Sequence, residues 1–122
     1  MAKRVMVVKM EPISTDTFED LVDAALASIP AHLRGRMENV AILIDDTSPP
    51  GPLYGLYEGT PLIGRRGAGG SSPDRITLFL ATICQAANNS IDLAHRVKVT
   101  VLHEIGHHFG LGENELRELG WA

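Results

Sequence analysis

Three of the five histidines stand within six residues, and two of them flank a glutamate in the pattern His103-Glu104-x-x-His107. On a helix, a spacing of four places His103 and His107 on one face about one turn apart, so both imidazoles can converge on one ion. Glu104 lies about 100° further round the helix axis, where its carboxylate can reach a water molecule on the metal instead of the metal itself. This pattern is typical of zinc hydrolases and predicts His103 and His107 as zinc ligands with Glu104 as the general base.

A third ligand is needed, because a catalytic zinc ion usually has three protein ligands and leaves its fourth position to water. Gly110 and Glu113 extend the pattern to His-Glu-x-x-His-x-x-Gly-x-x-Glu, the arrangement of metzincin peptidases with Glu in place of their third His. Glycine at 110 lets the chain leave the helix sharply and return Glu113 to the metal. Glu113 is therefore the predicted third ligand. The alternative is an acidic cap on the final helix, which the helix dipole favours.

The remaining candidate polar residues have weaker signals. His108 points elsewhere on the helix and is expected either to support a ligand or to lie on the surface. His32 and His95 have no partner in register and are expected on the surface. Tyr54 or Tyr57 could donate to a developing oxyanion, although tyrosines in strands more often serve packing.

The motif requires a long helix, and the sequence between Ile91 and Phe109 carries two competing patterns. Alternating Val97, Val99 and Val101 favour a strand, since β-branched residues pack well there. A helical stripe continues past Leu102, however, where the strand pattern breaks. We therefore predict one helix, ending near Gly110 or Gly112 in a left-handed cap. The stripe consists of Ala94, Val97, Val101, Leu102, Ile105 and Phe109.

Two further helices are predicted around this one. An apolar stripe from Ser14 to Ile29 indicates an amphipathic packing helix, with Ser14, Thr15 or Asp16 as its N-cap. Pro30 ends that helix. A short helix from Asn114 to Leu119, with Leu116 and Leu119 facing inward, follows the motif.

The predicted strands form a small sheet. The continuous apolar run Val40 to Ile44 favours a central strand covered on both faces. Leu53 to Glu58 is a second strand. Arg75 to Leu80 alternates as a strand with one buried face and is expected at an edge, where it could pair with an extended peptide. A short helical turn through Ile83 and Ala87 follows, and Val5 to Met10 is a possible extra strand.

The segment 49–73 holds seven of the twelve glycines and five of the seven prolines, so it is expected to be mostly turns and loop. Its window 65–72 lacks the Gly-Lys-Ser/Thr ending of a phosphate-binding loop and is interpreted as a hairpin tip. We see no linker that divides the chain. Residues 1–122 are therefore predicted to form one α+β domain.

Composition limits the partners. The chain has 122 residues, of which 44% are hydrophobic, and a net charge of -4, which argues against nucleic acid and anionic membranes as partners. Its early apolar run is too short for a signal peptide or a spanning helix. The single Cys84 cannot form an internal disulfide. A cytoplasmic protein is expected, with oligomeric state undetermined.

The segment Leu102 to Leu111 resembles that of the minimal zincins, small bacterial zincin-like metallopeptidases, as do Gly55-Leu56-Tyr57-Glu58-Gly59 and Pro73 to Leu78. The likeness extends from about Phe18 to Trp121. It implies a zincin-like α+β domain whose active-site helix holds zinc through His103 and His107. Unlike larger metzincins, no methionine follows Glu113, so no Met-turn can underlie the site. Downstream, Leu116, Leu119 and Trp121 are the candidates to form its floor.

These features predict a zinc metallopeptidase that cleaves peptides or unfolded segments through a metal-activated water, with Glu104 as the base. A zinc-binding interaction or regulatory protein with little hydrolytic activity is the alternative. Hydrolysis of a small non-peptide amide is a third possibility, which requires an enclosed pocket instead of a groove beside a strand edge.

Overall fold

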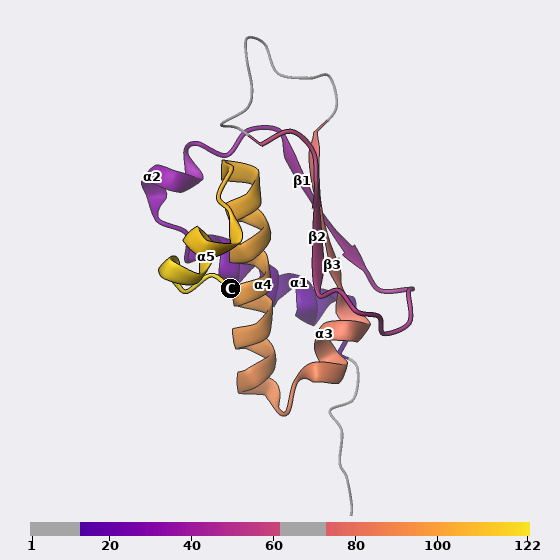
Figure 1. Cartoon of the computed structure of the whole chain (residues 1–122). Coiled ribbons are helices and arrows are strands. Elements are labelled where there is room, and N and C mark those ends of the chain that lie inside the picture. The colour runs from indigo at the N-terminus through magenta and orange to yellow at the C-terminus, as the bar shows by residue number, and fades with distance from the viewer. Residues whose placement is uncertain (1–12, 62–72) are drawn as a thin grey trace, which may run out of the picture.

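The computed structural model describes residues 13–61 and 73–122, which form a three-stranded sheet with a long helix standing beside it (Figure 1). The class is α+β, as predicted. Along the chain the elements are α1 (Thr15–Ala27), α2 (Ala31–Arg34), β1 (Val40–Asp45), β2 (Gly55–Glu58), β3 (Asp74–Phe79), α3 (Leu80–Ala86), α4 (Ser90–Phe109) and α5 (Glu113–Leu119). The possible strand Val5 to Met10 and the window 65–72 lie outside the described residues.

The sheet has the order β1-β3-β2, with β1 parallel and β2 antiparallel to β3. Two predictions of strand position are therefore wrong: the strand of Arg75 to Leu80 is central, and the strand of Val40 to Ile44 lies at an edge. The alternation in β3 is real, because Ile76 and Leu78 are buried. This alternation indicates that one face of the sheet is covered, but it does not indicate whether the strand lies at an edge of the sheet. On the other face Leu43 is 45% exposed, so β1 is not covered on both faces as predicted.

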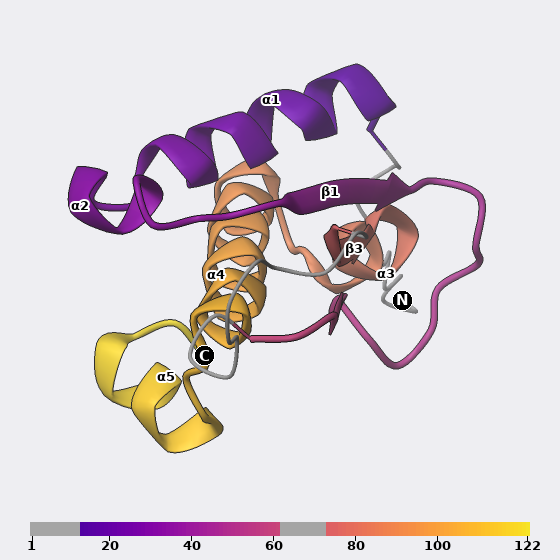
Figure 2. The ribbon, with the colours of Figure 1, turned by 90° about the horizontal axis from the view of Figure 1, so that it is seen from above.

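Helix α1 packs across α4 and closes the core (Figure 2). Its N-cap is Ser14, whose side chain accepts a hydrogen bond from the backbone N–H of Thr17 at 3.2 Å. Phe18, Val22 and Ala25 are buried against the core residues of α4. The packing role predicted for this helix is confirmed.

Helix α4 spans 20 residues and settles the conflict between strand and helix in favour of the helix. Its stripe of Val97, Val101 and Ile105 is almost fully buried. In α5, Leu116 is fully buried as predicted. The prediction that Leu119 faces inward is wrong, because Leu119 is 54% exposed and Leu116 is the one residue of this short helix that is buried. None of the described helices is both long and apolar enough to cross a membrane.

Candidate metal centre

Helix α4 begins and ends where its sequence directs. Asn89 is the N-cap and accepts a hydrogen bond from the N–H of Asp92 at 2.8 Å. Gly110 is the C-cap, with φ 93° in the left-handed region that glycine tolerates best. The N–H of Leu111 then bonds to the carbonyl of Gly106 at 2.9 Å, which turns the chain back on itself. This turn delivers Glu113 to the histidine face of α4.

Both motif histidines are held through Nδ1 by backbone carbonyls. His103 Nδ1 lies 2.9 Å from the Trp121 oxygen, and His107 Nδ1 lies 3.1 Å from the Leu111 oxygen. Because a carbonyl oxygen only accepts, each Nδ1 must carry a proton, and in the neutral ring each Nε2 then keeps its lone pair for a metal. The centroids of the two imidazole rings lie 4.8 Å apart, and the ring planes are nearly perpendicular. This is the arrangement that a pair of histidine ligands needs.

Glu113 brings the third donor to the same place. Its Oε1 lies 3.3 Å from His103 Nε2 and 3.2 Å from His107 Nε2. Two imidazole nitrogens and a carboxylate oxygen form the kind of donor set that zinc accepts in catalytic sites, so these residues fit a zinc ion. The side chain of Glu113 is 60% exposed, so one side of the donor set faces solvent.

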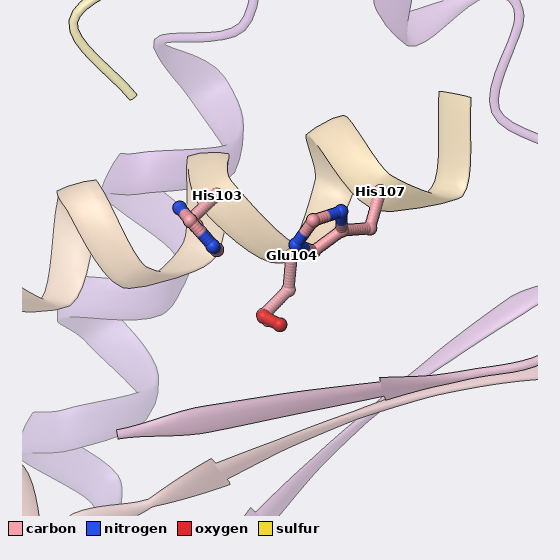
Figure 3. A group of neighbouring side chains, drawn as sticks. All are labelled: His103, Glu104 and His107. Atoms are coloured by element: carbon pink, nitrogen blue, oxygen red, sulfur yellow. The ribbon is translucent and has the colours of Figure 1, made fainter. Parts of the chain in front are cut away.

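Glu104 lies beside this donor set, on the side of the sheet (Figure 3). It is only 6% exposed, and burial raises the pKa of its carboxyl, while His103 and His107 oppose that rise. His103, Glu104 and His107 together form a group whose ligand atoms all lie within 4.8 Å of one another. Glu104 is therefore within reach of an ion that the two histidines could hold.

Leu116 and Trp121, two of the three residues predicted to form the floor of the site, lie beneath the motif. A Cβ atom on Gly106 would overlap the buried Leu116 side chain and would lie 3.6 Å from the Trp121 ring. Leu116 and Trp121 therefore pack directly against α4 at the centre of the motif. The exposed Leu119 takes no part in this contact.

A polar cluster that the sequence did not predict lies on the other side of α4. His108 is fully buried, and its Nδ1 lies 2.9 Å from Oδ2 of Asp74. It is therefore not a surface residue. The helical spacing gave a signal for this, because position 108 continues the buried stripe of Val97, Val101 and Ile105, where a polar side chain needs a partner.

Of the two tyrosines, Tyr57 has its hydroxyl turned away from the cleft, whereas Tyr54 stays a prediction. The hydroxyl of Tyr57 donates to Asp74 Oδ2 at 2.5 Å, which turns it toward the buried cluster. Tyr54 is 42% exposed on the cleft wall. His32 and His95 are exposed, as predicted.

A cleft of about 1020 Å³ runs along the histidine face of α4. One wall is β2 and the residues just before it, and the opposite wall is α4. The donor set lies at one end of this cleft, and Arg96, which bonds to Asp92 at 2.9 Å, lies two helical turns away on the same wall. Among the described strands β2 pairs with β3 alone, and residues 55–57 of β2 line the cleft.

The comparison with known families agrees with this geometry. Residues 37–121 match the model of the zincin-like metallopeptidases. The chain belongs to that family. Among solved structures, this zincin-like domain is similar to a conserved hypothetical protein from Thermo thermophilus, with a TM-score of 0.57 and 22% identity over 88% of this chain and 97% of the other. That likeness supports the zincin-like fold. A search of the curated proteins finds no match.

Proposed function

We propose that this protein is a cytoplasmic zinc-dependent metallopeptidase that cleaves peptides or unfolded protein segments. The observation that carries the proposal is the convergence of three donor atoms beside the buried carboxylate of Glu104: Nε2 of His103 and Nε2 of His107 both lie within 3.3 Å of Glu113 Oε1. Family membership supports a hydrolase of the metallopeptidase type.

In this proposal His103, His107 and Glu113 hold the zinc ion. When bound, zinc supplies a Lewis acid that polarises the scissile carbonyl and acidifies a water molecule. Glu104 accepts the proton of the attacking water and passes it to the leaving amine. Its burial and its place beside the two candidate histidine ligands support this role.

The cleft supports an extended peptide as the substrate. It lies along β2, and the edge of β2 that faces away from β3 could pair with a peptide backbone by strand addition. This moves the peptide-binding edge from β3, where the sequence had predicted it, to β2. A groove beside a strand edge also favours a peptide over a small amide, which would need an enclosed pocket.

The test compares the wild type with Glu104→Gln and His103→Ala, each assayed for zinc content and for cleavage of a diverse fluorogenic peptide library. Glu104→Gln keeps the shape of the side chain but removes the base, so zinc content should stay close to that of the wild type. Cleavage should fall by roughly 10² to 10⁴-fold. His103→Ala should lose zinc and activity together.

A zinc-loaded wild type that cuts no peptide faster than Glu104→Gln contradicts the peptidase proposal. The zinc-binding interaction protein then becomes the better explanation of the site.

A further inference from the structure

The cleft continues along α4 beyond the candidate metal ligands. Asp92, Arg96, Val99, His103 and His107 all line it, at spacings of three or four residues that keep their side chains on one helix face. Arg96 is the one Lys or Arg among the described residues that line the cleft. A side chain that is always positively charged therefore lies in the proposed substrate cleft, away from the reacting centre.

The guanidinium of Arg96 is held on one side only. Its Nε donates to Asp92 Oδ2 at 2.9 Å, and the N–H of Asn88 donates to the same oxygen at 2.9 Å. Within residues 13–61 and 73–122, its two Nη groups have no hydrogen-bond partner, and the side chain is 32% exposed. Arginine binds carboxylates through two parallel N–H···O bonds. The Nη groups are therefore suited to a second carboxylate, which a ligand would supply.

The distance between Arg96 and the candidate ligands corresponds to a short stretch of peptide. Arg96 precedes His103 by seven residues, which is a rise of about 10.5 Å along a helix. An extended peptide advances about 3.3 Å per residue. About three residues of an extended substrate therefore cover the length of α4 between these two side chains.

We propose that Arg96 is a specificity-determining residue, which binds a substrate carboxylate about three residues away from the bond that is cleaved. This carboxylate belongs either to an Asp or Glu side chain or to the C-terminus of the peptide, since both present the same pair of oxygens. The place of the cleaved bond rests on the proposed function. Binding of the carboxylate needs no cleavage and can be measured by itself.

The experiment measures Kd by isothermal titration calorimetry on zinc-loaded Glu104→Gln, which keeps the candidate ligands and lacks the base. The probes are alanine peptides with a hydroxamate, a bidentate zinc-binding group, at the C-terminus in one series and at the N-terminus in the other. Each peptide carries one Glu or one Gln, placed one to four residues from the hydroxamate. In one series, Glu at the third residue should bind about three- to tenfold more tightly than Gln. A free C-terminal carboxylate at that place, compared with its amide, tests the other source.

The controls separate recognition by Arg96 from loss of charge. Arg96→Gln should abolish the preference for Glu over Gln. Lys98→Gln removes the same charge from an exposed residue of α4 that does not line the cleft, and it should leave the preference unchanged.

Asp92→Asn separates recognition from a structural role of the ion pair. Both Asp92→Asn and Arg96→Gln break the pair, but only Arg96→Gln removes the cation. Asp92→Asn should therefore increase the preference for Glu, because a competing negative charge is gone. A pair that only stabilises the helix would give the same result in both variants.

Cleavage by the zinc-loaded wild type gives a second measurement. For peptides with Glu three residues from the cut, located by mass spectrometry, Arg96→Gln should raise KM about three- to tenfold and leave kcat unchanged. Peptides with Gln at that place should be cleaved equally by both proteins.

Equal Kd values for Glu and Gln peptides at every position overturn the proposal, as does an equal effect of Arg96→Gln and Lys98→Gln. Cleavage that does not depend on Arg96 also overturns it and leaves the proposed function intact. A preference for Glu that depends on Arg96 in a protein that cleaves nothing supports the carboxylate site and contradicts the peptidase. If no hydroxamate binds, the zinc site and the proposal both fail.

Discussion

His103 Nδ1 lies 2.9 Å from the carbonyl oxygen of Trp121, eighteen residues further along the chain. That carbonyl is fixed in turn, because the Trp121 N–H bonds to the Leu116 oxygen at 2.8 Å. One candidate ligand therefore takes its orientation from the segment after α5, outside the motif.

A chain shortened to end at Gly120 should lose that orientation. We expect zinc affinity to fall by about 10- to 100-fold, the usual cost of removing a partner that orients a ligand. Competition with a chromogenic chelator measures it. Ala122→Gly is the control, since it keeps Trp121 as a peptide carbonyl, and equal zinc affinity in this variant and in the shortened chain would contradict the role assigned to Trp121.

Glu113→Ala tests the third ligand. Two histidines alone should bind zinc loosely, so we expect at least a 10- to 100-fold loss of affinity, as for even indirect changes at zinc sites. Glu115→Ala, in the same first turn of α5, is the matched control for a lost acidic cap. If both variants bind zinc equally and as tightly as the wild type, Glu113 is a helix cap and not a ligand.

Gly106→Ala should destabilise the fold, because the new methyl group would overlap the fully buried Leu116 side chain. Overpacking of this kind costs about 1–3 kcal/mol, only partly offset by the better helix propensity of alanine. Urea unfolding of the metal-free protein measures the change. Gly35→Ala meets nothing closer than 3.6 Å and is the control. Adding Leu116→Ala to Gly106→Ala should relieve the clash at the cost of packing, so a smaller combined effect than the sum is expected.

Asp45 predicts an acid dependence of stability. Hydrogen bonds from the Ser48 side chain and backbone and from the Thr47 backbone lower the pKa of Asp45 from 3.8 to about 2. Since the folded pKa is the lower one, the stabilisation is complete above the unfolded value and is lost as the pH falls through 3.8 toward 2.

Urea unfolding of the metal-free protein at several pH values from about 2 to 6 measures this dependence. Asp45→Asn should lower the free energy of unfolding at neutral pH and flatten its slope below about pH 4. Asp23→Asn, on the exposed face of α1, serves as the control. An unchanged slope in Asp45→Asn would show that these hydrogen bonds do not hold the carboxylate in solution.

The site could be predicted largely from local sequence because its geometry is local. His103 and His107 are one helical turn apart, and the return of Glu113 toward them follows from one left-handed residue, Gly110. The predicted spacing, the cap and the helix all agree with the structure. What the spacing could not indicate is which carbonyls orient the rings, because those depend on how α5 returns to α4.

The order of the strands could not be predicted, because periodicity reports which face of a strand is buried and not which strands are its neighbours. The contact between Asp74 and His108 spans 34 residues, and that between Tyr57 and Asp74 spans 17. The first pair forms only when β3 meets α4, and the second only when β2 pairs with β3. Helix α2 was missed because it has four residues, buries none of them and begins after Pro30, which was interpreted only as a helix stop.

Helix α4 has two faces: one packs in the core, and the other lines the cleft. One face, with Val97, Val101 and Ile105, is locked into the core, where almost any change costs stability. The cleft face carries Arg96 and Val99, which are only partly buried and lie outside the donor set. Mutations there can change what the cleft accepts at little thermodynamic cost, so a directed-evolution library for altered selectivity belongs at these positions. In the proposed peptidase, the residues of the cleft face could therefore vary while the candidate metal ligands and the core stay constant.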